Sequence, residues 1–499
     1  MKTIRLIHTL LDESAFARPD ACAVRDAVGD WSYGQLAQQS RAFERWLSEQ
    51  GVGHGDRVVV QLPSTRELVA MFFGTSRRGA IFVPLNPGMK PYHLRTVLEN
   101  AAPELIIAAD AAADTLRGVT AVPVHGLESV WRGVQACSDA PARTETSGFG
   151  PDSIAALIYT SGSTATPKAV VCPHAQVIFA ASAIRAELGY RPGDVIFCRF
   201  PLSWDYGLYK VLLSCLGQSE LILADSESDL VLLKRIRETG ATVVPIVPSL
   251  ATMITRLAKR EKDPAPRVRM FTNTGAALTA ATIGELRSFF PGARIVRQFG
   301  QTECKRISIM PPEMDEEKPG SVGRPLPGTK VLILDSAGEP VPTGCNGEIV
   351  VTGPHVMPGY WRSPEQSARA FRLDSVGVPR LHTGDYGHLD EDGYLYFEGR
   401  RDDMFKHKGI RMSTIEIEAA AMDIPGVRAA AALPPNGGRG LALCAQTHLA
   451  PHEVLRELAK RLETAKVPSL CRTVDELPLT LHGKYETKAL EKLFDASAQ

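Results

Sequence analysis

The chain has 499 residues, of which 44% are apolar, so it is long enough for two or more domains with sizeable cores. Its 56 Lys and Arg residues balance 56 Asp and Glu residues, which argues against a nucleic-acid or membrane-surface partner. The nine Cys residues form no CxxC pair or Cys/His cluster, and no window approaches the about 20 apolar residues of a membrane span. We therefore expect a soluble, cytoplasmic protein without a disulfide framework or structural zinc.

Predicted strands and helices alternate through the first half of the chain. An apolar run at 56–63 is followed by a helical pattern and then by a second apolar run at 80–87. The alternation returns later, where helical patterns at 228–240 and 249–260 flank the β-branched run 241–248. This order predicts parallel sheets covered by helices.

A loop rich in hydroxyl groups follows a looser segment at 137–153. Residues 159–170 read YTSGSTATPKAV. Gly162 lets the backbone turn without Cβ clashes, and hydroxyls and backbone N–H groups can converge on an anion beside the positive charge of Lys168. A Walker loop requires a second Gly before its Lys, and this segment has none. The segment therefore predicts either another kind of phosphate-binding loop or a solvated Ser/Thr turn after a strand.

The pattern changes from about residue 320 onward. The segments 328–351 and 393–413 read as strands separated by Gly/Asp turns. Helical patterns then occupy 414–422, 452–465 and 486–494. We expect an α/β protein with a large N-terminal domain of layered sheets and helices, residues 1–400, and a small α+β C-terminal domain, residues 401–499.

Four short blocks follow the hydroxyl-rich loop. They read FGQTEC at 299–304, HTGDYG at 382–387, GRRDDMFKHKGIRMSTIEIE at 399–418 and PLTLHGKYETKAL at 478–490. Each block alone is also typical of a strand-end turn. Together, in this order and at these separations, they resemble the adenylate-forming superfamily, which includes acyl-CoA synthetases, amino-acid adenylation domains and luciferases. The resemblance covers nearly the whole chain and implies that the C-terminal domain is mobile.

The resemblance implies a role for each residue that matches a family motif. Glu303 would hold Mg²⁺, Thr302 would contact the α-phosphate as a catalytic residue, and Lys484 would be the mobile catalytic lysine. Asp402 would be the hinge between the domains, and Gly409 would lie beside the pantetheine tunnel. The phosphates of ATP would lie against Thr160, Ser161, Gly162, Ser163, Thr164 and Lys168. The adenine and ribose would lie against Gly275, Ala276, Ala277, Phe299, Gly300, Asp385 and Arg400.

The implied chemistry is attack of a carboxylate on the α-phosphate of ATP, for which positioning and electrostatic stabilisation dominate. An AMP-forming ligase of this class would pass its acyl group to CoA or to the phosphopantetheine of a free-standing carrier protein, in a specialised biosynthetic pathway. Ala165 and Ala169 stand where the family commonly has Gly. If either position needs positive φ, Ala costs about 1 kcal/mol or more. A nucleotide-binding relative without catalysis therefore stays as a further alternative.

The segment FPLSWDYGLYK at 200–210 bears on the choice of acid. Asp205 falls where amino-acid-activating domains keep the carboxylate that binds the substrate ammonium. It either binds an amino or β-amino acid in this way, or it is structural and caps the following helix, which would favour an aryl or acyl acid–CoA ligase. Trp204 would be a wall of the acid pocket or plain core packing, and Gly300 and Cys304 would border the pocket, Cys304 as packing. We interpret Lys305 and Arg306 mainly as structural or surface charges, with contact to an acidic substrate group as the alternative.

Overall fold

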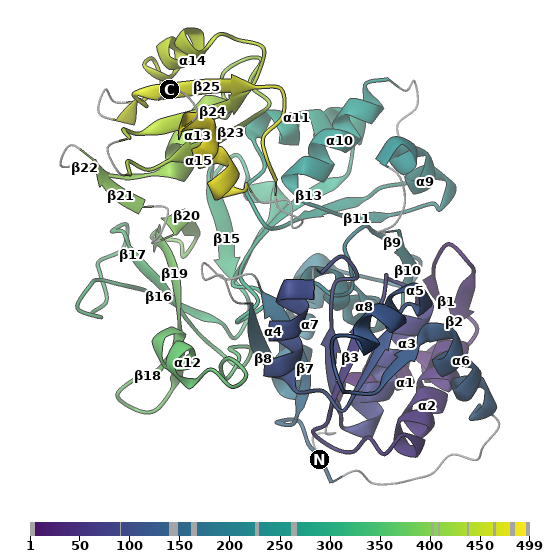
Figure 1. Ribbon diagram of the computed structural model, residues 1–499. Helices are drawn as coiled ribbons and strands as arrows, with labels where there is room; N and C mark the ends of the chain where they lie inside the picture. Colours follow the sequence, from purple (N-terminus) through teal and green to yellow (C-terminus); the bar gives the residue numbers. More distant parts are fainter. Residues whose placement is uncertain are drawn as a thin grey trace.

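The computed structural model describes eleven stretches of the chain, drawn in Figure 1: 5–89, 91–138, 148–160, 167–224, 229–260, 267–400, 404–407, 410–436, 439–462, 466–479 and 485–495. Within them strands and helices alternate, as the sequence predicts, and the α/β class is confirmed. All nine Cys residues are free. No helix among the described residues is long and apolar enough to cross a membrane.

A six-stranded sheet forms the first layer. Its order is β6–β5–β3–β4–β7–β8, and its neighbouring strands are parallel except for the β7–β8 hairpin. The strands are β3 (Arg57–Gln61), β4 (Ile81–Pro84), β5 (Leu105–Ala108), β6 (Val124–Gly126), β7 (Ile154–Thr160) and β8 (Lys168–Pro173). The helices of this region are α3 (Arg66–Arg78), α4 (Pro91–Ala101), α5 (Asp110–Arg117) and α6 (Leu127–Ala136).

The buried helix α3 illustrates how local sequence sets these elements. Thr65 caps its start by accepting a hydrogen bond from the backbone N–H of Leu68, and Gly79 ends it in the left-handed conformation, at φ 70°. All residues from 68 to 76 are buried, so this helix packs on more than one side.

A fourteen-stranded sheet forms the second layer. Its path runs β16–β17–β19–β20–β15–β14–β13–β12–β11–β9–β10–β1–β2, with β18 paired to β19. From β13 to β1 neighbouring strands are parallel. Their bounds are β13 (Arg294–Phe299), β12 (Met270–Asn273), β11 (Val243–Ile246), β9 (Val195–Cys198), β10 (Glu220–Leu223) and β1 (Cys22–Arg25). The other strands are β2 (Asp30–Ser32), β14 (Ser308–Met310), β15 (Ser321–Pro325), β16 (Lys330–Leu334), β17 (Gly347–Thr352), β18 (Phe371–Leu373), β19 (Pro379–Leu389) and β20 (Leu395–Arg400).

Helices accompany this sheet along the chain. They are α1 (Ile7–Ala17), α2 (Tyr33–Glu49), α7 (His174–Leu188), α8 (Asp205–Gly217), α9 (Leu232–Glu238), α10 (Pro248–Ala258), α11 (Ala280–Phe289) and α12 (Pro364–Ala370), with short 3-10 turns at Asp229–Val231 and Pro312–Met314. The largest apolar cluster joins α1, α2, α3, α7 and α8.

The C-terminal part, yellow and green in Figure 1, has its own small elements. Strands β23 (Ala429–Leu433), β24 (Ala442–Gln446) and β25 (Leu470–Val474) form one sheet, and β21 (Met404–His407) and β22 (Ile410–Ser413) form a hairpin. Helices α13 (Thr414–Met422) and α15 (Thr487–Asp495) fall where the sequence predicts them, and α14 (Pro451–Leu458) begins as predicted but ends short of the predicted residue 465. Two apolar clusters, around Leu443 and Leu433, lie wholly within this part. The domain boundary at residue 400 stays a prediction.

Candidate active site

Three predicted site segments follow neighbouring parallel strands. Asp205 comes after β9, the segment 273–278 after β12, and the segment 299–306 after β13. Because β9, β11, β12 and β13 are parallel neighbours, the segments after them meet at one edge of the sheet, where α/β proteins bind ligands. The contacts agree with this placement. The ammonium of Lys305 lies 3.1 Å from the Asp205 carboxylate, and Arg306 donates to the Thr274 hydroxyl at 2.8 Å.

Asp205 is the first residue of α8 and does not cap it. The N-cap is Trp204, which makes no side-chain capping hydrogen bond, so the predicted capping role of Asp205 is wrong. Its carboxylate lies in the first turn, where the helix dipole stabilises negative charge. Gly207 allows this helix to begin close to the preceding loop, since a Cβ there would lie 2.2 Å from the carbonyl oxygen of Pro201.

Lys305 and Arg306 were interpreted as structural or surface charges, and both are buried, so the surface interpretation is wrong and the structural one stays possible. Their exposed fractions are 3% and 2%. Lys305 also has φ 61°, in the left-handed region, which costs a residue with a side chain about 1–2 kcal/mol. Gly300 makes room for this segment, because a Cβ there would come within 2.7 Å of the Arg306 Cα. The sequence signal for these residues is two adjacent cations directly after the FGQTEC motif.

The site carries an excess of buried positive charge. The Asp205 carboxylate, with 22% of its side chain exposed, is paired with Lys305, and Arg306 lies nearby without an ion-pair partner among the described residues. Burial lowers the pKa of Lys305 to about 8, although Asp205 acts to raise it, and burial also lowers the pKa of Arg306. A third cation, Lys210 on α8, is 1% exposed. Sequence analysis missed Lys210, whose only signal is a charge inside an apolar helix.

The predicted nucleotide residues lie along the same strands. Asp385 and Arg400 are cross-strand partners on β19 and β20, with the Arg400 Nε 3.1 Å from the Asp385 carboxylate. Gln301 donates to the carbonyl oxygen of Thr383 at 3.4 Å, which joins the FGQTEC and HTGDYG segments. The ring of Phe299 lies 5.1 Å from that of Phe397. After β12, the loop residues Gly275, Ala276 and Ala277 are exposed.

The predicted phosphate loop joins two antiparallel strands. Thr160 ends β7 and Lys168 begins β8 directly opposite it. Ser161, Gly162, Ser163 and Thr164 lie outside the described residues, as does Ala165. Ala169 lies in β8 and is paired with Tyr159 of β7. Its φ is not positive, so the backbone strain predicted for Ala at this position is absent.

Tyr360 connects this loop to the predicted metal ligand. Its hydroxyl donates to the Glu303 carboxylate at 2.7 Å, and the Lys168 ammonium lies 5.4 Å from its ring centroid. Glu303 fits the predicted Mg²⁺ role, because an ionised carboxylate that accepts one hydrogen bond keeps other lone pairs for a hard cation. No sequence signal marked Tyr360.

The remaining predictions fall in three groups. Cys304 is fully buried among apolar side chains, and burial raises the pKa of its thiol, which agrees with its predicted packing role. Trp204 is partly buried, with its ring 6.4 Å from that of Phe200. Thr302 is partly buried beside Glu303. Asp402, Gly409 and Lys484 lie outside the described residues.

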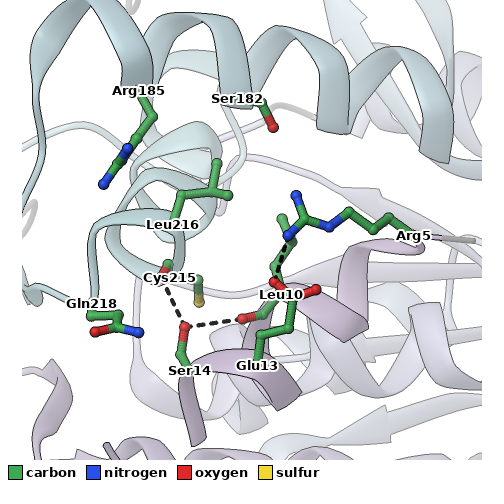
Figure 2. Close-up of a pocket in the computed structure, with 9 residues that line it drawn as sticks. All are labelled: Arg5, Leu10, Glu13, Ser14, Ser182, Arg185, Cys215, Leu216 and Gln218. Atoms are coloured by element: carbon green, nitrogen blue, oxygen red, sulfur yellow. Dashed lines mark hydrogen bonds and ion pairs between the residues drawn. The ribbon is translucent and has the colours of Figure 1, made fainter. Parts of the chain in front are cut away.

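A cavity of about 320 Å³ lies elsewhere, between α1, α7 and the far end of α8 (Figure 2). Figure 2 shows Cys215 and Leu216 facing it, together with Arg5, Leu10, Glu13 and Ser14 of the N-terminal segment. Asp205 is at the opposite end of α8, about 18 Å away along the helix. None of the predicted site residues lines this cavity, so it is not the candidate active site.

The fold and the order of the sequence motifs are those of the adenylate-forming superfamily. The family model described as AMP-binding enzyme matches residues 11–361, and the chain belongs to this family. The predicted resemblance to this family is thereby confirmed.

Curated relatives include whole synthetases and one stand-alone ligase. The chain spans only 6%, 21% and 20% of the length of the first three relatives, which are nonribosomal peptide synthetases. It is 28% identical over 498 residues to an L-proline--[L-prolyl-carrier protein] ligase of Streptomyces coelicolor, a match that covers 92% of this chain and 91% of the relative.

Two solved structures are similar across most of the chain. VinN is 56% identical with a TM-score of 0.76, covering 79% of this chain and 99% of VinN, and it has also been solved in complex with L-aspartate and with 3-methylaspartate. ATP-bound MatB from Rhodopseudomonas palustris is 26% identical with a TM-score of 0.87, covering 99% of this chain and 100% of MatB.

Proposed function

We propose that this protein adenylates an amino dicarboxylic acid of the aspartate type and transfers it to a phosphopantetheine thiol. The observation that carries the proposal is the ion pair between buried Lys305 and partly buried Asp205, with Arg306 beside it and no second carboxylate among the described partners of these cations. A buried guanidinium is always charged and needs an anion. The site therefore suits a ligand that brings its own carboxylate in addition to the one that reacts.

An amino dicarboxylic acid satisfies both signs of charge in this site. Its ammonium would bind the carboxylate of Asp205, which is more exposed than Lys305. Its second carboxylate would then replace Asp205 as the partner of Lys305 and would also face Arg306, where bidentate contacts are strong. VinN, which is similar to this chain, has been solved with two acids of this kind.

The remaining residues would act as the family resemblance implies. Glu303 would hold Mg²⁺, which neutralises phosphate charge, and Thr302 would contact the α-phosphate. Asp385 and Arg400 would bind the ribose, and Lys168 with the loop 160–164 would bind the phosphates. Lys484 would meet the reacting carboxylate, and rotation at Asp402 would bring Gly409 toward the thiol of a carrier protein or CoA.

A second candidate is supported by the ion pair itself. Because Lys305 already neutralises Asp205, the carboxylate can be structural, and the site would then take a dicarboxylic acid without an ammonium for transfer to CoA. The two candidates differ in what they predict for succinate, which lacks the amine of aspartate.

Acid-dependent ATP–pyrophosphate exchange tests the proposal. The panel contains L-aspartate, 3-methylaspartate, succinate, and β-alanine, which lacks the second carboxylate. We expect both aspartates to exceed succinate and β-alanine by about 100-fold, because each missing group leaves a buried partner unpaired. Asp205→Asn should remove the preference for aspartate over succinate.

Three results would contradict the proposal in different ways. Equal exchange with succinate and L-aspartate in the unaltered protein would favour the second candidate. Preference for β-alanine would exclude a site for a second carboxylate. ATP binding without exchange for any acid would indicate the non-catalytic relative.

A further inference from the structure

Lys210 has no role in the proposed function so far, although it is among the most buried charged residues of the protein. It lies on α8 five residues after Asp205 and is 1% exposed. It forms no ion pair with any described residue, and the Asp205 carboxylate, whose charge acts on it, is already paired with Lys305.

Three cationic side chains surround the ring of Tyr206. The nitrogen of Lys210 lies 4.2 Å from the ring centroid, that of Lys305 lies 5.6 Å away, and the guanidinium carbon of Arg306 lies 5.9 Å away. A desolvated cation gains about 2 kcal/mol from such a ring, whereas burying an unpaired charge costs several kcal/mol. One ring therefore cannot offset three buried charges.

The three cations differ in how their charge is balanced. Arg306 keeps its charge under all ordinary conditions, and Lys305 has the Asp205 carboxylate 3.1 Å away. Lys210 has neither advantage. Burial, then Lys305 and Arg306, lower its pKa well below the ordinary value, while Cys198 and Asp205 oppose this shift. Lys210 is thus the group of the cluster that most readily stays uncharged.

We propose that Lys210 is a specificity-determining residue of the acid site, uncharged in the ligand-free protein and protonated when the second carboxylate of the acid binds beside it. The inference rests on the proposed function. The second carboxylate of the acid adds negative charge beside the cluster, which raises the affinity of the Lys210 amine for a proton, and the amine takes one proton from solvent. No covalent bond to the acid forms. An acid without a second carboxylate should leave Lys210 uncharged.

Isothermal titration at pH 7 measures the proton directly. L-Aspartate is titrated into the full-length protein in Tris and in phosphate, two buffers with different heats of ionisation. We expect uptake of about one proton per L-aspartate, because one amine is charged in the step. Saturating β-alanine should cause no uptake.

Lys210→Met keeps most of the side-chain volume and removes the amine. We expect it to abolish the uptake and to weaken L-aspartate binding about tenfold or more, as for loss of a charged hydrogen bond. Lys234→Met, the same change at an exposed residue of α9, should alter neither. Far-UV circular dichroism and ATP binding establish that the variants are folded.

The outcomes distinguish a failure of the Lys210 proposal from a failure of the proposed function. L-Aspartate binding without proton uptake in the unaltered protein would overturn the role of Lys210 and leave the proposed function standing, and this arm needs no variant. Uptake that persists in folded Lys210→Met, or that β-alanine also causes, would overturn it as well. If neither L-aspartate nor 3-methylaspartate binds or supports exchange, the proposed function itself is wrong.

Discussion

Lys305 combines features that are costly at a single residue. Its backbone is in the left-handed region, at φ 61°, and its ammonium is buried with the carboxylate of Asp205 as its only ion-pair partner among the described residues. Strained backbone and buried charge together cost a few kcal/mol and are concentrated at ligand sites in proteins. The Lys305 side chain lies against α8, with its nitrogen 4.3 Å from the ring centroid of Tyr209. We therefore infer that Lys305 serves ligand binding and does not stabilise the fold.

Tyr360 provides a test of how Glu303 is positioned. Tyr360→Phe removes the hydroxyl that donates to the Glu303 carboxylate at 2.7 Å and keeps the ring beneath Lys168. If Glu303 holds the metal, loss of this outer partner should weaken metal binding about tenfold, as is usual for residues that orient a ligand. Electron paramagnetic resonance of Mn²⁺ in the presence of ATP measures this without turnover.

The matched control for Tyr360 is Tyr394→Phe, at a tyrosine that lies beside Lys318 and Arg324 instead of Glu303. It should leave Mn²⁺ affinity unchanged. Equal Mn²⁺ affinity in Tyr360→Phe and the unaltered protein would show that Glu303 needs no such support.

At the residue scale, the sequence predicted positions that lie inside motifs and missed those that do not. Asp385 and Arg400 were each predicted from a separate block, and they are paired across two strands. Tyr360 contacts Glu303 from 57 positions away, a separation that no local pattern encodes. Lys305 was misjudged because charge in sequence indicates exposure unless a fold supplies a buried partner.

Helix α8 is the element that organises the acid site. Its first six residues carry Asp205, Tyr206, Tyr209 and Lys210, so one helix start places a carboxylate, two rings and an amine together. The hydroxyl of Tyr206 donates to the backbone oxygen of Thr272 at 2.6 Å, which fixes the helix to β12. The position of α8 therefore determines the geometry of every charge in the cluster.

Gly207→Ala should displace this helix. The added Cβ would lie 2.2 Å from the carbonyl oxygen of Pro201 and 2.7 Å from that of Phe200, both backbone atoms that yield only if the loop moves. We expect a loss of about 1–3 kcal/mol in stability and a larger fall in acid-dependent exchange than in ATP binding. Urea unfolding and the exchange assay measure the two effects.

Gly284→Ala is the paired control, because Gly284 lies within α11 and a Cβ there meets no atom within 4 Å. It should raise stability by about 0.5–1 kcal/mol through helix propensity. Equal stability of the two variants would mean that the approach of α8 to the 200–201 loop is not tight.

Element positions were more predictable than contacts. The alternation of strand and helix was readable from 56–87 and 241–260 because hydrophobic period and β-branching reflect local burial. The order of strands in the large sheet was not readable, since β9 lies next to both β10 and β11 through pairings between distant segments. That order brings Asp205 to the edge shared by β12 and β13, and so it decides the site.

At the scale of the whole molecule, the N-terminal core contains histidines that are buried in their neutral form. His174 is 0% exposed, and its Nδ1 accepts a hydrogen bond from the backbone N–H of Ile7 at 3.2 Å, which links α7 to α1. Burial lowers the pKa of His174 to about 3, and burial followed by Arg77 lowers that of His8 to about 4. In the unfolded chain both pKa values return to about 6.5.

These shifts predict a loss of stability in acid. Because the folded pKa values are depressed, the unfolded chain binds more protons below pH 6.5, and the stabilisation present at higher pH is lost as pH falls toward 4. Two pH units correspond to about 2.7 kcal/mol per histidine. The urea midpoint read by fluorescence should therefore fall steeply between pH 6.5 and 4.5, since Trp31, Trp46 and Trp131 lie in or against the same core.

His174→Gln should remove about one proton from the number taken up on unfolding. The slope of the unfolding free energy against pH should therefore fall by about 1.4 kcal/mol per pH unit, even though the variant is less stable at pH 7. His452→Gln, at an exposed position of α14, should leave the steepness unchanged. The comparison of slopes separates protonation from packing, because a packing defect shifts the whole curve by the same amount at every pH. A His174→Gln curve parallel to that of the unaltered protein would therefore show that His174 does not resist protonation in the folded state.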